Sequence, residues 1–160
     1  MTEIIRDILI LSFRKLKELQ PDLLESTSET TMTEWNFGHH YANILCQYFD
    51  GYDCELDCIK RSMDRNRPDI IFHKRKTSEH NLFVLELKIS EKISSSDSKK
   101  IKEKWMDGSL NYKYGCCISV SRDWFLKGEI FYNKKHKETF TSDNYGKKER
   151  IISFFKIDDA

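Results

Sequence analysis

Two charged side chains stand inside one otherwise apolar segment, residues 82–89, with the sequence LFVLELKI. Such a segment is typical of a buried β-strand, yet it contains Glu86 and Lys88. Because side chains alternate along a strand, both charges fall on the face that also carries Leu82 and Val84. An isolated buried charge is costly unless it is paired or binds a metal. The pattern therefore predicts a site that holds these two charges.

A second acid is brought to the same place by the expected pairing of this strand with residues 68–73. Opposed residues of a hairpin have a constant sum of residue numbers, and pairing Asp69 with Glu86 centres the turn in the polar segment 74–81. A symmetric hairpin therefore places Asp69 beside Glu86, unless a bulge or a one-residue slip changes the register. Two adjacent carboxylates favour a hard cation, Mg²⁺ or Mn²⁺, over zinc or copper.

A third acid, Glu34, lies on a helix predicted over residues 33–49, with Thr33 as its N-cap. Glu34 extends the apolar stripe of this helix by one turn, so its carboxylate is expected to point toward the sheet. There it would reach the metal directly, through a water or through a second ion, while Gly38 leaves room for close approach. The alternative is an ordinary acid at a helix N-terminus, stabilised by the helix dipole.

The runs Arg67-Pro68-Asp69 and Glu86-Leu87-Lys88, with the helical Glu34 upstream, resemble the motif of the PD-(D/E)xK nuclease superfamily. The wording RPDIIFHKR followed by NLFVLELK looks like a group of small bacterial proteins of this type. The resemblance covers residues 33–120, a little over half of the chain. It implies an α/β fold with a restriction-endonuclease-like core, in which a helix and a three-strand meander are followed by a helix and a strand.

The resemblance also implies the roles of the site residues. Lys88 is expected to position or activate the attacking water, either as an ammonium that donates hydrogen bonds or after its pKa has been lowered. Glu34, Asp69, Glu86 and Lys88 form the expected catalytic set. The expected ligands of Mg²⁺ or Mn²⁺ are Asp69, Glu86, Leu87 and Glu34.

A basic side chain on the following helix often assists in such enzymes. The candidates for contact with nucleic acid are Lys99, Lys100 and Lys102, among which the sequence does not choose. His73 lies on the Asp69 side of its strand and is expected to line the site or to finish the strand edge. His39 and His40 are adjacent on a helix and do not face one another, so they are expected to touch substrate or an interface rather than to form a paired ligand set.

The remaining elements complete one domain of 160 residues. Apolar spacing predicts helices over residues 3–19 and about 94–110, the latter capped by Ser95 or Asp97, with Ile101 and Trp105 on its apolar face. Strands are predicted over residues 52–61 and 114–120, and a C-terminal hairpin joins 128–133 to 150–157 through a loop over 134–148. We therefore expect an N-terminal helix over 1–24, a catalytic core over 33–120 and a C-terminal β extension over 121–160.

Composition limits the possible partners. With 27 Lys and Arg against 26 Asp and Glu, the net charge of +1 provides no global attraction to polyanions. A homodimer or a partner protein is therefore expected to help to grip the substrate. Charged residues interrupt the apolar N-terminal segment, which excludes a membrane span and favours a cytoplasmic location. The five cysteines are expected to be reduced, because no secretion signal indicates an oxidising compartment. A zinc site is not expected, since Cys54 and Cys58 share a strand face with Leu56 and no second ligand pair follows: Cys116 and Cys117 are adjacent and point to opposite faces of a strand.

Together these patterns predict a metal-dependent endonuclease that acts on DNA. Two alternatives remain open. The first is an RNA-directed nuclease with the same residues. The second is a non-catalytic nucleic-acid-binding or protein-interaction module that has kept the fold.

Overall fold

A computed structural model describes residues 1–25, 30–57, 67–77, 79–107 and 109–143. The helical elements are α1 (Thr2–Leu19), η1 (Pro21–Leu24), α2 (Thr30–Leu45), α3 (Ser95–Lys100) and η3 (Ile101–Trp105), a π-helix that continues α3. The strands are β1 (Asp53–Leu56), β2 (Ile70–His73), β3 (Phe83–Ile89), β4 (Tyr114–Val120), β5 (Leu126–Tyr132) and β6 (His136–Thr141). The described part of the chain is therefore an α/β protein, as expected.

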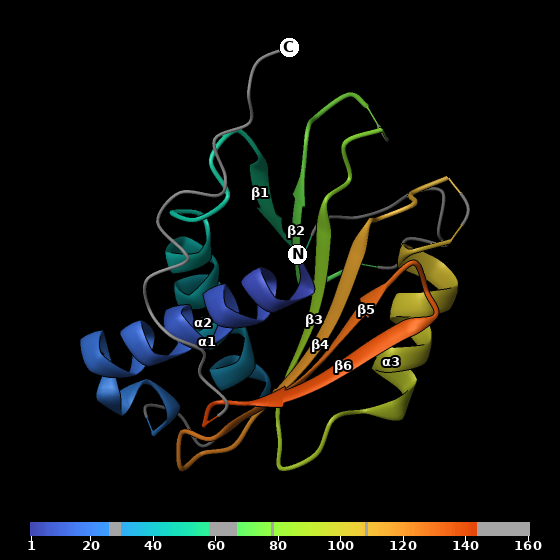
Figure 1. Cartoon of the computed structure of the whole chain (residues 1–160). Helices are drawn as coiled ribbons and strands as arrows, with labels where there is room; N and C mark the ends of the chain where they lie inside the picture. Colours follow the sequence, from blue (N-terminus) through green and yellow to red (C-terminus); the bar gives the residue numbers. More distant parts are fainter. Residues whose placement is uncertain (26–29, 58–66, 78, 108, 144–160) are drawn as a thin grey trace.

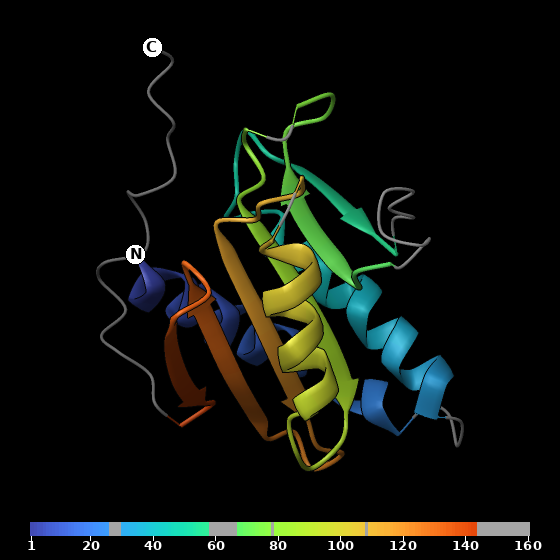
Figure 2. The same ribbon diagram turned by 90° about the vertical axis from the view of Figure 1, so that its right-hand side faces the viewer.

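The six strands form one mixed sheet in the order β1-β2-β3-β4-β5-β6. All neighbours are antiparallel except β3 and β4, which are parallel and are connected through α3 and η3. Helices α1 and α2 cover one face of the sheet and α3 covers the other (Figures 1 and 2). None of the helices in the described ranges is long and apolar enough to cross a membrane.

Alternation along β3 divides the interior into two cores, one on each face of the sheet. Leu85 and Leu87 belong to the larger core, together with the apolar faces of α1 and α2. Val84 belongs to the smaller core, together with Ile101 and Trp105 of η3. The predicted alternation is confirmed within β3, and Glu86, which shares the parity of Val84, faces the α3 side of the sheet. The prediction is wrong for Leu82, which precedes the strand and packs against the larger core.

The predicted register between β2 and β3 is also confirmed. Ile70 pairs with Leu85 and Phe72 pairs with Phe83, so each pair has the same number sum as Asp69 and Glu86. Strand β2 begins at Ile70, while β3 continues to Ile89. The last residues of β3 therefore extend beyond its hydrogen-bonded pairing with β2, and Asp69 lies at the point where that pairing ends.

Close approach of η3 to β4 depends on a glycine. A Cβ added at Gly115 would lie 2.3 Å from Cγ2 of Ile101 and 2.8 Å from the sulfur of Met106. Both distances are shorter than real Cβ contacts, so only glycine allows this packing. Gly38 was predicted to leave room for close approach of another group. An added Cβ there would meet nothing within 4 Å, so no other element packs closely against Gly38 as Ile101 does against Gly115. Gly38 borders open space rather than a tightly packed neighbour.

The predicted N-caps of two helices are wrong. Helix α2 begins at Thr30, so Thr33 is a buried residue inside the helix and not its N-cap. Helix α3 is capped by Ser94, which has extended backbone angles and whose side chain accepts a hydrogen bond from the Asp97 N–H. Ser95 and Asp97 are therefore the first and third residues of the helix. Several serines in succession offer equivalent caps, and only the backbone conformation selects one.

The C-terminal hairpin was predicted with the wrong second strand. Strand β6 lies within residues 134–148, which were expected to form a loop, and pairs with β5 along its whole length. Phe140 is its one fully buried side chain, so β6 lacks the repeated apolar alternation that predicts a strand. The strand predicted over 150–157 and the end of the one predicted over 52–61, with Cys58, lie outside the described residues.

Candidate active site

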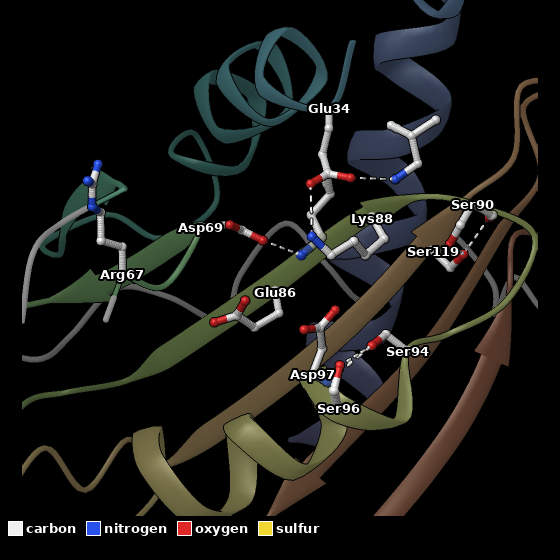
Figure 3. A network of polar contacts seen from close by, with 12 residues as sticks. Glu34, Arg67, Asp69, Glu86, Lys88, Ser90, Ser94, Ser96, Asp97 and Ser119 are labelled. Carbon is white, nitrogen blue, oxygen red and sulfur yellow. Dashed lines mark hydrogen bonds and ion pairs between the residues drawn. The ribbon is translucent and has the colours of Figure 1, made fainter. Parts of the chain in front are cut away.

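Two acids occupy the edge of β3 where β2 has ended. The Leu87 N–H donates to Oδ2 of Asp69 at 2.6 Å, and the Ile89 N–H donates to Oε2 of Glu34 at 3.1 Å (Figure 3). Alternate residues of a strand direct their N–H groups to the same edge, so the two carboxylates replace the missing strand. A buried N–H without a partner is costly, which gives both acids a structural reason to point here. Glu34 therefore points inward, as its helix position predicted.

Glu34 also holds the lysine of the motif. Its Oε1 lies 3.1 Å from Nζ of Lys88. Burial lowers the pKa of Lys88, but the hydrogen bond to Glu34 and the charges of Glu34, Asp97 and Asp69 outweigh burial, so this pKa is raised. Lys88 is therefore an ammonium at neutral pH. Of its two expected roles, the geometry favours the donation of hydrogen bonds over the acceptance of a proton.

Glu86 is the most deeply buried acid of the site, with 3% of its surface exposed. Its Oε1 accepts a hydrogen bond from Nε1 of Trp105 at 2.6 Å, and its Oε2 accepts one from Nζ of Lys100 at 2.8 Å. Burial, followed by repulsion from Asp69, raises the pKa of Glu86 to about 7, although Lys100 and Trp105 oppose that shift. Even with these two hydrogen-bond donors, the Glu86 carboxyl group is therefore partly protonated near neutral pH.

The π-helical turn explains how Lys100 and Trp105 meet at one carboxylate. Residues five apart point in different directions on an α-helix, which turns every 3.6 residues. Residues 101–105 form a π-helix, in which the Met106 N–H bonds to the Ile101 carbonyl, and this wider turn brings positions five apart onto one side. Single π turns are frequent at functional sites. Of the three lysines proposed for this helix, Lys100 is the one placed at Glu86.

The other lysines and His73 lie elsewhere. Nζ of Lys99 is 3.9 Å from the exposed carboxylate of Glu103, and Nζ of Lys102 lies over the ring of Phe131. His73 lies at the opposite end of β2 from Asp69, and its Nε2 is 3.2 Å from Oε2 of Glu55. Sequence periodicity put His73 on the correct face but could not show that it lies too far along the strand to line the site.

Asp69, the second acid of the pair with Glu86, is half-buried. Burial raises the pKa of its carboxyl, and the repulsion from Glu34 acts in the same direction. The Leu87 N–H and the ammonium groups of Lys100 and Lys88 oppose the shift without cancelling it. Two neighbouring acids with raised pKa values, one buried and one half-buried, are stabilised by a proton or by a cation.

The oxygen ligands available at this site fit a magnesium ion better than a zinc ion. In the described ranges, no group of three or more His, Cys, Asp and Glu side chains is arranged to hold a metal. Asp69 and Glu86 remain, and Leu87 could add only its main-chain carbonyl, which faces the same strand edge as its N–H. Magnesium is commonly bound by one or two carboxylates, with water and substrate oxygens as the other ligands. Glu34, engaged with Lys88 and Ile89, stands outside this pair.

Two residues of the site were not recognised in the sequence. Trp105 was assigned to an apolar helix face, although a buried indole N–H usually needs an acceptor, which here is Glu86. Asp97 was considered only as a helix cap, but its carboxylate points from α3 toward β3, between Glu86 and Lys88 (Figure 3). Its Oδ2 is buried and has no hydrogen-bond partner in the described part of the chain.

The cysteines take no part in this arrangement. Cys116 belongs to the larger core and Cys117 to the smaller one, so the two point to opposite faces of β4, as expected. Cys46, Cys54, Cys116 and Cys117 are all free thiols.

The comparisons with known proteins leave the site to be judged on its geometry. No family model matches this chain, and no curated protein and no solved structure matches it.

Proposed function

We propose that this chain is a metal-dependent nuclease of the PD-(D/E)xK type that hydrolyses phosphodiester bonds within DNA. The observation that carries the proposal is the placement of two acids together, the buried Glu86 and the half-buried Asp69, beside the ammonium of Lys88. Such a pair is unfavourable in the folded protein unless it serves to bind a proton or a cation. Together with the motif that the three residues spell, this placement favours a catalytic site.

The order of the elements supports the same proposal. From α2 to β4 the chain runs through a helix, three antiparallel strands, a helix and a strand parallel to the third. This is the order that the resemblance implied for a restriction-endonuclease-like core. Helix α1 precedes that core, and the β5-β6 hairpin extends its sheet.

In the proposed enzyme, Mg²⁺ or Mn²⁺ would be held by Asp69, Glu86 and the carbonyl of Leu87. When bound, the cation lowers the pKa of water and relieves the negative charge on the phosphoryl oxygens. Lys88, fixed by Glu34, donates hydrogen bonds that orient the attacking water or a phosphate oxygen. Lys100 and Trp105 fix the rotamer of Glu86.

A non-catalytic module is the second candidate, and one observation favours it. Each acid already has a partner in the protein: Glu86 binds Lys100 and Trp105, Asp69 binds the Leu87 N–H, and Glu34 binds Lys88. The net charge of +1 likewise provides no overall electrostatic attraction to a polyanion. In this case Asp69 and Glu34 would only complete the edge of β3, Glu86 would only hold Lys100 and Trp105, and nucleic acid or a partner protein would bind without being cleaved.

Cleavage assays separate the two candidates. The full chain is incubated with supercoiled plasmid, single-stranded DNA and RNA, in Mg²⁺, Mn²⁺ or EDTA. We expect metal-dependent cleavage that falls by about a hundredfold or more in Asp69→Ala, because a metal ligand is lost. The matched control is Glu103→Ala, an acid of η3 whose side chain is 62% exposed. Cleavage that survives EDTA or equals the wild type in Asp69→Ala overturns the proposal, and binding without cleavage supports the module.

A further inference from the structure

An aromatic pair lies on α2 directly after Glu34. Trp35 is 60% exposed, and its ring stacks against the ring of His39 with centroids 5.9 Å apart and planes inclined by 12°. The two residues are four apart on a helix, so their rings are neighbours on its surface. A single exposed apolar side chain needs no explanation, but two parallel aromatic faces next to a candidate active site do.

Trp35, the first member of this pair, lines a small cavity together with acids of the site. Its volume is about 160 Å³, and its lining includes Glu34, Trp35, Gly38, Asp69 and Leu87. Gly38 keeps it open, since a Cβ at that position would meet nothing within 4 Å. Leu56 adds a partly exposed apolar wall. The lining of the cavity therefore combines the aromatic and apolar side chains of Trp35 and Leu56 with the acids Glu34, Asp57 and Asp69.

We infer that Trp35 and His39 form a stacking platform for one unpaired nucleobase, and that strands with unpaired bases are the preferred substrates. This inference rests on the proposed nuclease function, which it makes more specific. A base has a planar face that stacks on an aromatic ring, and such stacking tolerates any sequence. In a duplex, the same face is covered by neighbouring bases.

The charge of the protein supports a contact of this kind. Proteins that bind duplexes through phosphates alone depend on an excess of basic residues, whereas this chain carries a net charge of +1. Stacking supplies binding free energy that does not depend on net charge. Trp35 lines the same cavity as Asp69, so a base held on Trp35 would place the neighbouring phosphodiester near the acids of the site.

Binding measurements in EDTA, where the proposed enzyme does not cleave, test the platform. The probes are a short single-stranded DNA, an RNA of the same sequence and the DNA duplex, each followed by fluorescence anisotropy. We expect Trp35→Ala to weaken single-strand binding roughly 5- to 150-fold, the range for the loss of one stacked base. Trp35→Phe should retain most of the affinity, and the duplex should bind all variants alike. The DNA and RNA arms show which strand is preferred.

Two further variants keep the test independent of folding. Leu19→Ala removes an apolar side chain that is 63% exposed at the C-terminal end of α1 and does not line the cavity, and it should bind like the wild type. Gly38→Leu fills the cavity without changing an acid or an aromatic ring, and it should weaken single-strand binding as Trp35→Ala does. Thermal unfolding confirms that each variant is folded.

The possible failures can be told apart. If the wild type cleaves in a metal- and Asp69-dependent manner while Trp35→Ala binds single strands normally, the platform is overturned and the nuclease remains. If the wild type cleaves no nucleic acid, the proposed function fails and this inference fails with it. If Trp35→Ala instead changes the sedimentation of the protein alone and leaves binding unaltered, the surface joins two copies of the chain, which also overturns the platform.

Discussion

Glu86→Gln tests whether the buried acid is held at a cost to stability. Burial and Asp69 raise the pKa of Glu86 from 4.5 to about 7 in the folded protein. Between these two pH values, the folded protein keeps the proton that the unfolded chain has released. The free energy of unfolding therefore falls as the pH rises through this window. Each tenfold change in proton affinity corresponds to about 1.4 kcal/mol, so the loss amounts to about 3 kcal/mol.

The variant removes this dependence but keeps the shape of the side chain. The glutamine oxygen can still accept the hydrogen bond from Trp105, so packing should change little. We expect the wild type in EDTA to lose about 3 kcal/mol of stability between about pH 4.5 and pH 7, and Glu86→Gln to lose much less. Urea unfolding followed by circular dichroism at several pH values measures the difference.

A control and an added cation sharpen the comparison. Glu103→Gln changes an exposed acid of the same helical segment, so its stability should follow the wild-type dependence on pH to within about 0.5 kcal/mol. Saturating Mg²⁺ should restore the wild type at pH 7 and should have little effect on Glu86→Gln. The same pH dependence in the wild type and in Glu86→Gln would refute the assignment of this carboxyl as the buried titrating group.

Three smaller predictions follow from single contacts. Gly115→Ala should destabilise the protein by about 1–3 kcal/mol in thermal unfolding, because its Cβ would overlap Ile101, and an unchanged melting temperature contradicts this. Gly38→Ala, the matched control, should stabilise helix α2 by about 0.5–1 kcal/mol, since its Cβ enters open space; a loss of stability would show that the space is filled. Glu34→Gln should lower the pKa of Lys88, which an NMR titration of the lysine side chains detects; an unchanged value would mean that Glu34 does not hold the ammonium.

Alternation and turn symmetry are local properties, and they predicted the centre of this protein correctly. The apolar run around Glu86 predicts which residues of β3 share a face, and the position of the polar segment before it predicts which residues of the hairpin are paired. From these two facts the sequence placed Asp69 beside Glu86 without knowledge of the rest of the chain. The inward position of Glu34 followed in the same way from the stripe of one helix.

Contacts between distant segments could not be obtained in this way. The sequence offered Lys99, Lys100 and Lys102 as equivalents, and the choice of Lys100 depends on a π turn and on the close approach of that turn to Gly115. Strand β6 was missed because its pairing with β5, rather than its own pattern, makes it a strand.

By itself, the sequence determined which acids lie on the same face of the sheet, because side-chain parity is set by the residues next in the chain. Only the tertiary structure decided the partners of those acids. Lys88 meets Glu34, Glu86 meets Trp105, and the cavity beside Trp35 opens, because separate elements pack against one sheet. The distance between two such elements depends on all the side chains between them, and no local pattern contains it.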